Sequence, residues 1–223
     1  MCYDKESSAA AFVYATAIVG VLWWRNYPND RFMAFFCFAI ALIQAVEFVL
    51  WSNPRCSALN HRATNAAALI ILAQPLVVLA GMTYYRNTRV PIKLLRRLVW
   101  IYAAIWVGAF VKLVIIDKGP RCTRGAPGKH LNWDYDLTAT GSGESSAALW
   151  LVWLLPFFLF MAMRDQDYGV AVFSLLIVTL ILSLGKGLAM DRADSSSWRS
   201  LYCFLGNSLP LAVLGIGYMK YGR

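Results

Sequence analysis

The sequence predicts an all-α membrane protein with seven transmembrane helices. Of its 223 residues, 59% are hydrophobic and 15% are charged, whereas a soluble domain has about 45–50% apolar and about 25% charged residues. The apolar residues fall in seven blocks, each near the roughly 20 residues that cross a hydrocarbon core. The runs are uninterrupted, which indicates helices and not a β-barrel. They take up most of the chain, so we expect one transmembrane domain over 1–223.

The seven predicted spans are 9–24, 32–51, 65–85, 93–116, 146–163, 168–190 and 200–219. The first ends in Trp23-Trp24-Arg25 and not in a small-residue cleavage site, so we expect a retained span and not a cleaved signal. Pro28 breaks the chain before the second span, and a polar loop with Pro54 precedes the third.

The fourth span, 93–116, is the centre of the predicted arrangement. It opens with the basic cluster Lys93, Arg96 and Arg97 and carries Lys112 about one turn from its end. A polar loop rich in Gly and Pro, 117–145, follows it. The fifth span contains Pro156, which we interpret as a kink. A short polar turn separates the fifth span from the sixth, and a serine-rich loop separates the sixth from the seventh.

The basic residues divide evenly between the two sides of these spans, so their number alone gives no orientation. The densest group, from Arg86 to Arg97, lies on the side opposite the N-terminus and favours a cytoplasmic location for that side. Cys2, Cys56 and Cys122 all lie in loops of the N-terminal side, as expected in an oxidising compartment. We therefore expect an outside or lumenal N-terminus and a cytoplasmic C-terminus. Cys56 and Cys122 are a candidate disulfide, with free loop thiols as an equal alternative.

Two stretches that flank the fourth span resemble one another. The motif Glu-Ser-Ser-Ala-Ala occurs at 6–10 and at 144–148, and Pro-Leu-x-Val-Leu occurs at 75–79 and 210–214, so the offsets are 138 and 135 residues. This order favours a duplicated three-helix unit, 6–85 and 146–219, in parallel orientation and joined by the linker helix 93–116. Convergence remains the alternative, because a polar cap followed by Ala is a common helix start.

This three-plus-one-plus-three plan resembles that of SWEET and PQ-loop carriers and the class linked to opsins. The resemblance implies a solute path through the bundle, but the carriers' Pro-Gln dipeptide is reversed here, as Gln74-Pro75, so no functional residue is transferred. A retinal Schiff base is not expected, because the seventh span has no lysine before Lys220. The string 44–51 also weakly resembles uncharacterised multi-span proteins of algae and large DNA viruses, which implies no function.

Glu47 and Lys112 are the main candidate site residues. A charge inside a membrane helix costs about 2.5–3.5 kcal/mol on insertion scales and so usually faces protein or water. Both residues lie about one turn from the same end of the bundle, which allows an ion pair. Gln44, Glu47 and Trp51 share one face of their helix. The small residues Ala104 and Gly108 precede Lys112 on its own face and predict that Lys112 points inward. A ligand or proton site is one interpretation; a structural pair or snorkelling to head groups is the other, slightly favoured one.

Gln74 and Asn207 lie near mid-depth, each close to a proline that frees a backbone carbonyl. They either contact a ligand or form interhelical hydrogen bonds, and the second interpretation is slightly favoured. The segment 129–136 mixes aromatic and acidic residues. It would either cover a pocket or, as we favour, pack on the rim of the bundle.

Enzyme chemistry has little support in the sequence. The only histidines, His61 and His130, lie in predicted loops, and no spacing typical of metal ligands occurs. We therefore expect no catalytic residue, metal or haem. The net charge of +9 comes without a nucleic-acid motif, so we expect the basic residues to contact lipid head groups.

The function predicted from the sequence is binding or transport of a small polar or amphipathic ligand, or of a proton, near Glu47, with Lys112 as its counter-charge. Two alternatives remain. One is a structural or lipid-binding subunit of a homo- or hetero-oligomeric membrane assembly, and the other is a seven-helix receptor.

Overall fold

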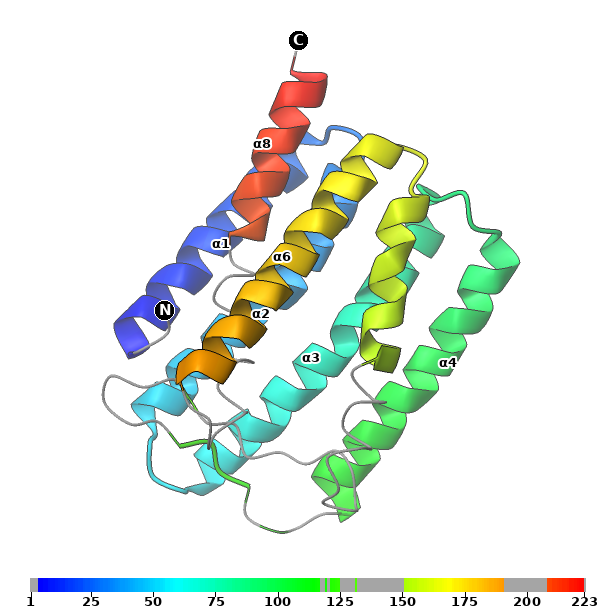
Figure 1. Ribbon diagram of the computed structural model, residues 1–223. Coiled ribbons are helices and arrows are strands. Elements are labelled where there is room, and N and C mark those ends of the chain that lie inside the picture. The colour runs from blue at the N-terminus through cyan, green and yellow to red at the C-terminus, as the bar shows by residue number, and fades with distance from the viewer. Residues whose placement is uncertain are drawn as a thin grey trace.

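The computed structural model describes residues 4–116, 119, 121–124, 131, 151–190 and 208–222, with the backbone alone for 183–190. Over these ranges the regular elements are helices, apart from isolated β-bridges such as that between Thr88 and Met163. The all-helical prediction is therefore confirmed. The elements shown in Figure 1 are α1 (Lys5–Arg25), α2 (Asp30–Ser52), α3 (Ala58–Tyr85), α4 (Ile92–Phe110), η1 (Val111–Ile116), η2 (Leu155–Ala162), α6 (Gln166–Met190) and α8 (Leu209–Tyr221).

Four helices in the described part of the chain are long and apolar enough to cross a membrane. They are α1, α2, α3, and α4 with its continuation η1, as Ile92–Ile116. Two shorter apolar helices, Leu151–Ala162 and Gln166–Leu182, lie in the fifth and sixth predicted spans. The helix α8 lies in the second half of the predicted seventh span. Helices thus occur in each predicted span, while the number of membrane crossings stays a prediction.

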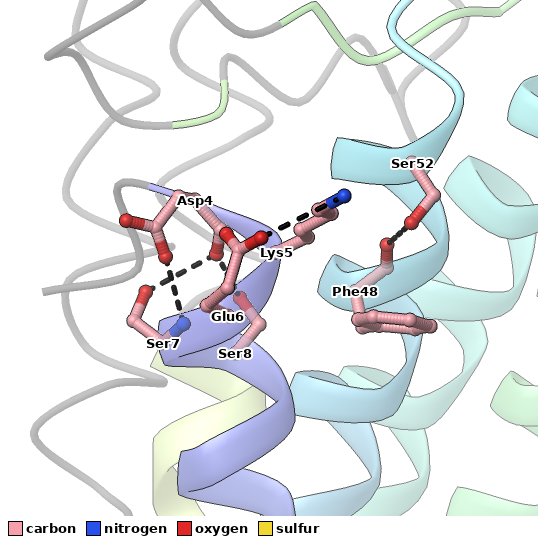
Figure 2. Close-up of polar contacts among 7 residues, drawn as sticks. All are labelled: Asp4, Lys5, Glu6, Ser7, Ser8, Phe48 and Ser52. Atoms are coloured by element: carbon pink, nitrogen blue, oxygen red, sulfur yellow. Dashed lines mark hydrogen bonds and ion pairs between the residues drawn. The ribbon is translucent and has the colours of Figure 1, made fainter.

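The first helix begins at a side-chain cap. The Asp4 carboxylate accepts a hydrogen bond from the Ser7 backbone N–H at 2.7 Å, and the Asp4 backbone carbonyl accepts the Ser7 and Ser8 hydroxyls at 3.1 Å each. Asp and Ser are favoured at helix starts because they satisfy N–H groups that have no partner within the helix. Figure 2 shows this start beside the end of α2, where the Ser52 hydroxyl donates to the Phe48 carbonyl.

The core lies around α2, which packs against both α1 and α3. Four aromatic side chains, Phe32 and Phe36 of α2 and Phe157 and Phe160 of η2, pack at tilted angles, with the centroids of neighbouring rings 5.5–5.8 Å apart. Helices α2 and α3 approach closely at Gly81, where an added Cβ would lie 2.6 Å from the Phe32 ring. A larger residue at this crossing would force the two helices apart.

The helix α4 lies at one edge of the bundle, with α1 and α8 at the other edge (Figure 1). Two hydrogen bonds fix it in place. The Trp106 indole donates to the Leu69 carbonyl of α3 at 2.9 Å, and the Tyr102 hydroxyl donates to the Val152 carbonyl at 2.6 Å. Most of its remaining surface is apolar and exposed, including Trp100, Ile101, Ile105, Val107 and Phe110.

One predicted boundary was wrong, and two helices have local geometry that the sequence did not predict. The third helix begins at Ala58 and not at residue 65, because Ser57 caps it by accepting the Asn60 backbone N–H at 3.2 Å. The fourth helix is α-helical only to Phe110 and continues as the π-helix η1. The end of the fifth segment, Leu155–Ala162, is a 3-10 helix, with Pro156 in its first turn.

Backbone contacts join two loops at one end of the bundle. The Arg89 N–H donates to the Ala162 carbonyl at 2.9 Å, and the Arg164 N–H donates to the Asn87 carbonyl at 2.8 Å. Gly169 then lets the start of α6 cross close to η2, because an added Cβ would overlap the Phe160 carbonyl. The connection after α3 and the connection before α6 therefore lie at the same end.

Candidate functional site

The polar residues predicted on α2 are buried in an apolar helix. Glu47 and Gln44, one turn apart, both have 0% exposed surface. Trp51, one turn beyond Glu47, is half-buried. Its indole N–H has no hydrogen-bond partner in the part of the chain that the structure describes. The burial of Gln44 and Glu47 shows that this part of the shared face points into the bundle. Trp51 lies at the margin of that face.

Gln74 lies inside the bundle on α3. It is fully buried, and neither its amide nitrogen nor its amide oxygen has a hydrogen-bond partner among the described residues. Buried amides without partners are rare, since each unsatisfied polar group costs about 1–3 kcal/mol. A bound polar ligand would provide hydrogen-bond partners for the Gln74 amide.

The carbonyl freed by Pro75 is used within the protein. Proline lacks the N–H that would bond the carbonyl four residues earlier, that of Ile71. The Trp153 indole, which is buried, donates to this carbonyl at 2.8 Å. An interhelical hydrogen bond therefore accounts for this proline, as one of the two sequence interpretations expected.

The register of α2 against α3 orders the buried polar residues along one interface. Phe32 lies against Gly81 near one end, and the Asn60 amide donates to the Asn53 carbonyl at 2.7 Å near the other. Between these points Glu47 lies at the level of Asn65, with Gln44 next and Gln74 deeper. At 1.5 Å per residue, Glu47 and Gln74 are about 12 Å apart along the axis.

One end of this interface is closed by the segment 121–124. The Asn60 amide donates to the Thr123 carbonyl at 2.9 Å, and the Thr123 N–H donates to the Thr64 hydroxyl at 3.0 Å. The Asn65 amide donates to the Leu113 carbonyl of η1 at 3.1 Å. Cys56 and Cys122, the pair nominated from the sequence, form a disulfide that holds the same segment. Asn60 and Thr64 were missed because the sequence placed them in a loop and not at the start of α3.

The small residues of α4 that precede Lys112 do not lie at a close helix crossing. Ala104 and Gly108, the small residues on its face, are exposed, and a Cβ added at Gly108 would meet nothing within 4 Å. The close helix approach argued from these two residues was therefore wrong, because α4 packs at the edge of the bundle, while the direction of Lys112 stays a prediction. Lys112 itself is half-buried in η1.

Ion pairs of the described residues include those of Lys5 with Glu6, of Arg25 with Asp30, and of Lys220 with Asp165 and Asp167. The pairing of Glu47 with Lys112 as its counter-charge stays a prediction. Asn207 lies outside the described residues, as does the segment 129–136 apart from the buried Leu131.

A second polar cluster, not predicted from the sequence, attaches α8 to the turn between α1 and α2. Asp30 is fully buried, and Arg25 donates to both of its carboxylate oxygens, at 2.7 and 2.8 Å. A third Arg25 nitrogen donates to the Leu214 carbonyl of α8 at 2.8 Å. Gly217 makes room for this guanidinium, because an added Cβ would overlap it. Opposite charges five residues apart across a helix-breaking turn were the signal available in the sequence.

Asp165, before α6, forms a further contact with α8. Its carboxylate accepts hydrogen bonds from Lys220 and from the Tyr221 hydroxyl. Burial by itself raises the pKa of Asp165, but these two bonds, the Tyr168 backbone N–H and the charge of Lys220 together outweigh it, and the net pKa is lowered. The carboxylate is therefore charged at neutral pH and holds the end of α8.

Neither a metal cluster in the described residues nor a known relative assigns a function. Within the described ranges, no group of three or more His, Cys, Asp or Glu side chains is placed to hold a metal ion. Compared with known proteins, the chain matches no family model, no curated protein sequence and no solved structure. Its function must therefore be argued from the buried polar residues themselves.

Proposed function

We propose that the protein is a multi-pass membrane protein whose helices enclose a site, centred on Glu47, that binds a proton or a small polar ligand and moves it across the membrane. The observation that carries the proposal is the complete burial of Glu47 in a helix apolar enough to cross a membrane. Ionisable residues in such helices are expensive and usually mark ion or substrate paths.

The roles follow from the chemistry of the side chains. Glu47 gains and loses a proton or binds a cationic group. Gln44 and Gln74 present amide donors and acceptors along the path on the side away from the disulfide. Trp51 lines the end of the path, Asn207 adds an amide near mid-depth, and Lys112 balances the charge of Glu47. In this arrangement the units 6–85 and 146–219 move against each other around the linker helix 93–116, with the N-terminus outside.

Proton flux into liposomes tests the proposal. Purified protein is reconstituted with a trapped pH-sensitive dye, and a potassium diffusion potential drives protons inward. We expect flux in the natural protein, a loss of about 10-fold or more in Glu47→Gln, and no change in Glu6→Gln, which removes the same charge from an exposed position. Equal flux in the natural protein and Glu47→Gln would show that Glu47 does not couple.

A non-catalytic subunit of a membrane assembly is the second candidate. The exposed apolar face of α4 favours it, because such a face can pack against another membrane helix. If this second candidate is correct, sedimentation in detergent should give a mass greater than that of one chain, and the protein should show no proton flux. A single-chain particle that conducts protons would favour the first proposal instead.

A further inference from the structure

A groove between the end of α3 and the start of α4 combines two arginines with apolar and aromatic walls. Arg86, Arg96, Thr83, Tyr84, Val99 and Trp100 line it. Its volume is about 600 Å³, within the roughly 300–1,000 Å³ of small-molecule sites. It lies at the end of the bundle opposite the disulfide and outside the α2–α3 interface that contains Glu47.

The charges of this groove have no protein partner among the described residues. Arg86 and Arg96 are exposed and take part in none of the ion pairs found there. The first turn of α4 contains no acidic residue, so carboxylates do not neutralise them locally. Two guanidinium groups on one groove form a suitable site for a phosphate, which arginine binds with paired N–H donors.

Arg86 is positioned by the cap of α3. Its backbone is left-handed, with φ of 51°, and its N–H donates to the Met82 carbonyl at 3.0 Å. This position usually carries glycine, which adopts the conformation without a steric penalty. An arginine here gives up that advantage and places a cation at the negative end of the helix.

The groove is polar at its rim and apolar further in. Arg86 lies just past the end of α3, and Arg96 lies in the second turn of α4. Val99 and Trp100 follow one turn deeper, and Trp100 and Tyr84 are 76% and 80% exposed. Exposed Trp and Tyr beside basic residues are typical of the boundary between lipid head groups and acyl chains. A free anion would use only the rim, whereas a phospholipid would use both parts.

We propose that this groove binds an anionic phospholipid, with its phosphate on Arg86 and Arg96 and an acyl chain along Val99 and Trp100. The inference rests on the membrane placement in the proposed function but not on the Glu47 site. Basic pockets between helices on the cytoplasmic side are known to bind such head groups.

Native mass spectrometry of the full chain tests this. The protein is released from detergent micelles that contain equal amounts of phosphatidylglycerol and phosphatidylcholine, and the retained lipid is counted. We expect retention of phosphatidylglycerol. Arg86→Gln/Arg96→Gln should weaken it about 30-fold, given about 1 kcal/mol per basic residue and a factor of 10 per 1.4 kcal/mol.

Lys93→Gln/Arg97→Gln is the matched control, because it removes equal charge from the same helix end outside the groove. It should retain the lipid. The single variant Arg96→Gln serves if the double variant unfolds. Trp100→Ala should also weaken lipid retention relative to the natural protein. Inorganic phosphate alone should not compete with phosphatidylglycerol for the groove.

Three results would overturn the inference: equal loss in both double variants, competition by inorganic phosphate at the same concentration as the lipid, or equal retention of both lipids. Lipid retention is measured without proton flux. A failure of the lipid proposal is therefore distinguishable from a failure of the proposed role of Glu47.

Discussion

At the residue scale, single polar groups decide how the helices meet. The Trp153 indole satisfies the Ile71 carbonyl that Pro75 leaves without its helical partner. At the other crossing, Arg25 reaches both Asp30 and α8 only because Gly217 has no side chain. In both cases one helix is attached where another lacks a group: Pro75 lacks a backbone N–H, and Gly217 lacks a side chain.

Trp153→Phe should lower the free energy of unfolding by about 1–3 kcal/mol, because it leaves the Ile71 carbonyl buried without a donor. In a Pro75→Ala background the restored N–H can bond that carbonyl, so the same substitution should have a smaller effect. Denaturant unfolding of the four proteins in detergent gives the double-mutant cycle. An equal effect of Trp153→Phe in both backgrounds would mean that the two residues are not linked.

Gly217→Ala should destabilise the protein by about 1–3 kcal/mol, because the added methyl group displaces Arg25 from Asp30. Gly215→Ala is the matched control on the same helix, where an added Cβ meets nothing within 4 Å. That variant should be neutral or stabilised by up to about 1 kcal/mol through helix propensity. Melting temperatures compare the two, and similar values would rule out the close contact at Gly217.

At the element scale, α8 is held at its end by charge. Asp165 binds Lys220 and Tyr221, and its pKa is lowered below the usual 3.8. A lowered pKa means that the stabilisation is complete above the unfolded-state pKa and is lost as pH falls through the folded-state pKa. The contribution is modest, because the Lys220 side chain is 32% exposed.

Asp165→Asn should therefore lower stability at pH 7 by up to about 1 kcal/mol and have little effect below the folded-state pKa, where the natural carboxyl is itself protonated. Asp167→Asn provides the control, since Asp167 is 96% exposed and 3.6 Å from Lys220. Thermal unfolding from pH 3 to pH 7 measures the difference. A difference between Asp165→Asn and the natural protein that does not vary with pH would exclude the ionic contribution.

Element positions were predictable from the sequence wherever an apolar run dominates. The bodies of α1, α2 and α4 follow such runs because each crosses an apolar environment or core. The start of α3 was missed, since Asn60 and Thr64 resemble loop residues. Only the Ser57 cap signals a helix there. Ala104 and Gly108 predicted a buried face of α4 but are exposed. Small residues allow close packing of helices, but they do not specify which helix, if any, packs there. The attachment of Thr123 depends on contacts between residues distant in sequence, which periodicity does not encode.

At the scale of the whole molecule, the two ends of the bundle are fixed differently. The disulfide from Cys56 to Cys122 and the Asn60 and Thr64 contacts hold one end. Backbone bonds from Arg89 and Arg164, with the Arg25–Asp30 pair, hold the other. Under the proposed orientation, the disulfide lies in the oxidising compartment and the groove with Arg86 faces the cytoplasm.

A membrane-impermeant reductant tests this orientation. In sealed right-side-out vesicles, a variant with its three other cysteines replaced by alanine should become labelled at Cys56 and Cys122 when a phosphine and a maleimide are added outside. Reduction in detergent should lower the free energy of unfolding by about 2–4 kcal/mol, since the bond closes a long loop. Labelling of Cys56 and Cys122 only after the vesicles are opened would show that the orientation is opposite to the proposed one.

The claim on which the function depends is that the buried carboxylate of Glu47 exchanges with the transport path and is not a sealed structural group. A membrane-penetrant carbodiimide, which attaches to carboxyl groups in apolar surroundings, measures this directly in proteoliposomes. We expect mass spectrometry to find the label on Glu47 and proton flux to fall in proportion to the labelled fraction. Full labelling of Glu47 with unchanged flux, or an unlabelled Glu47 under conditions that stop flux, would contradict the account.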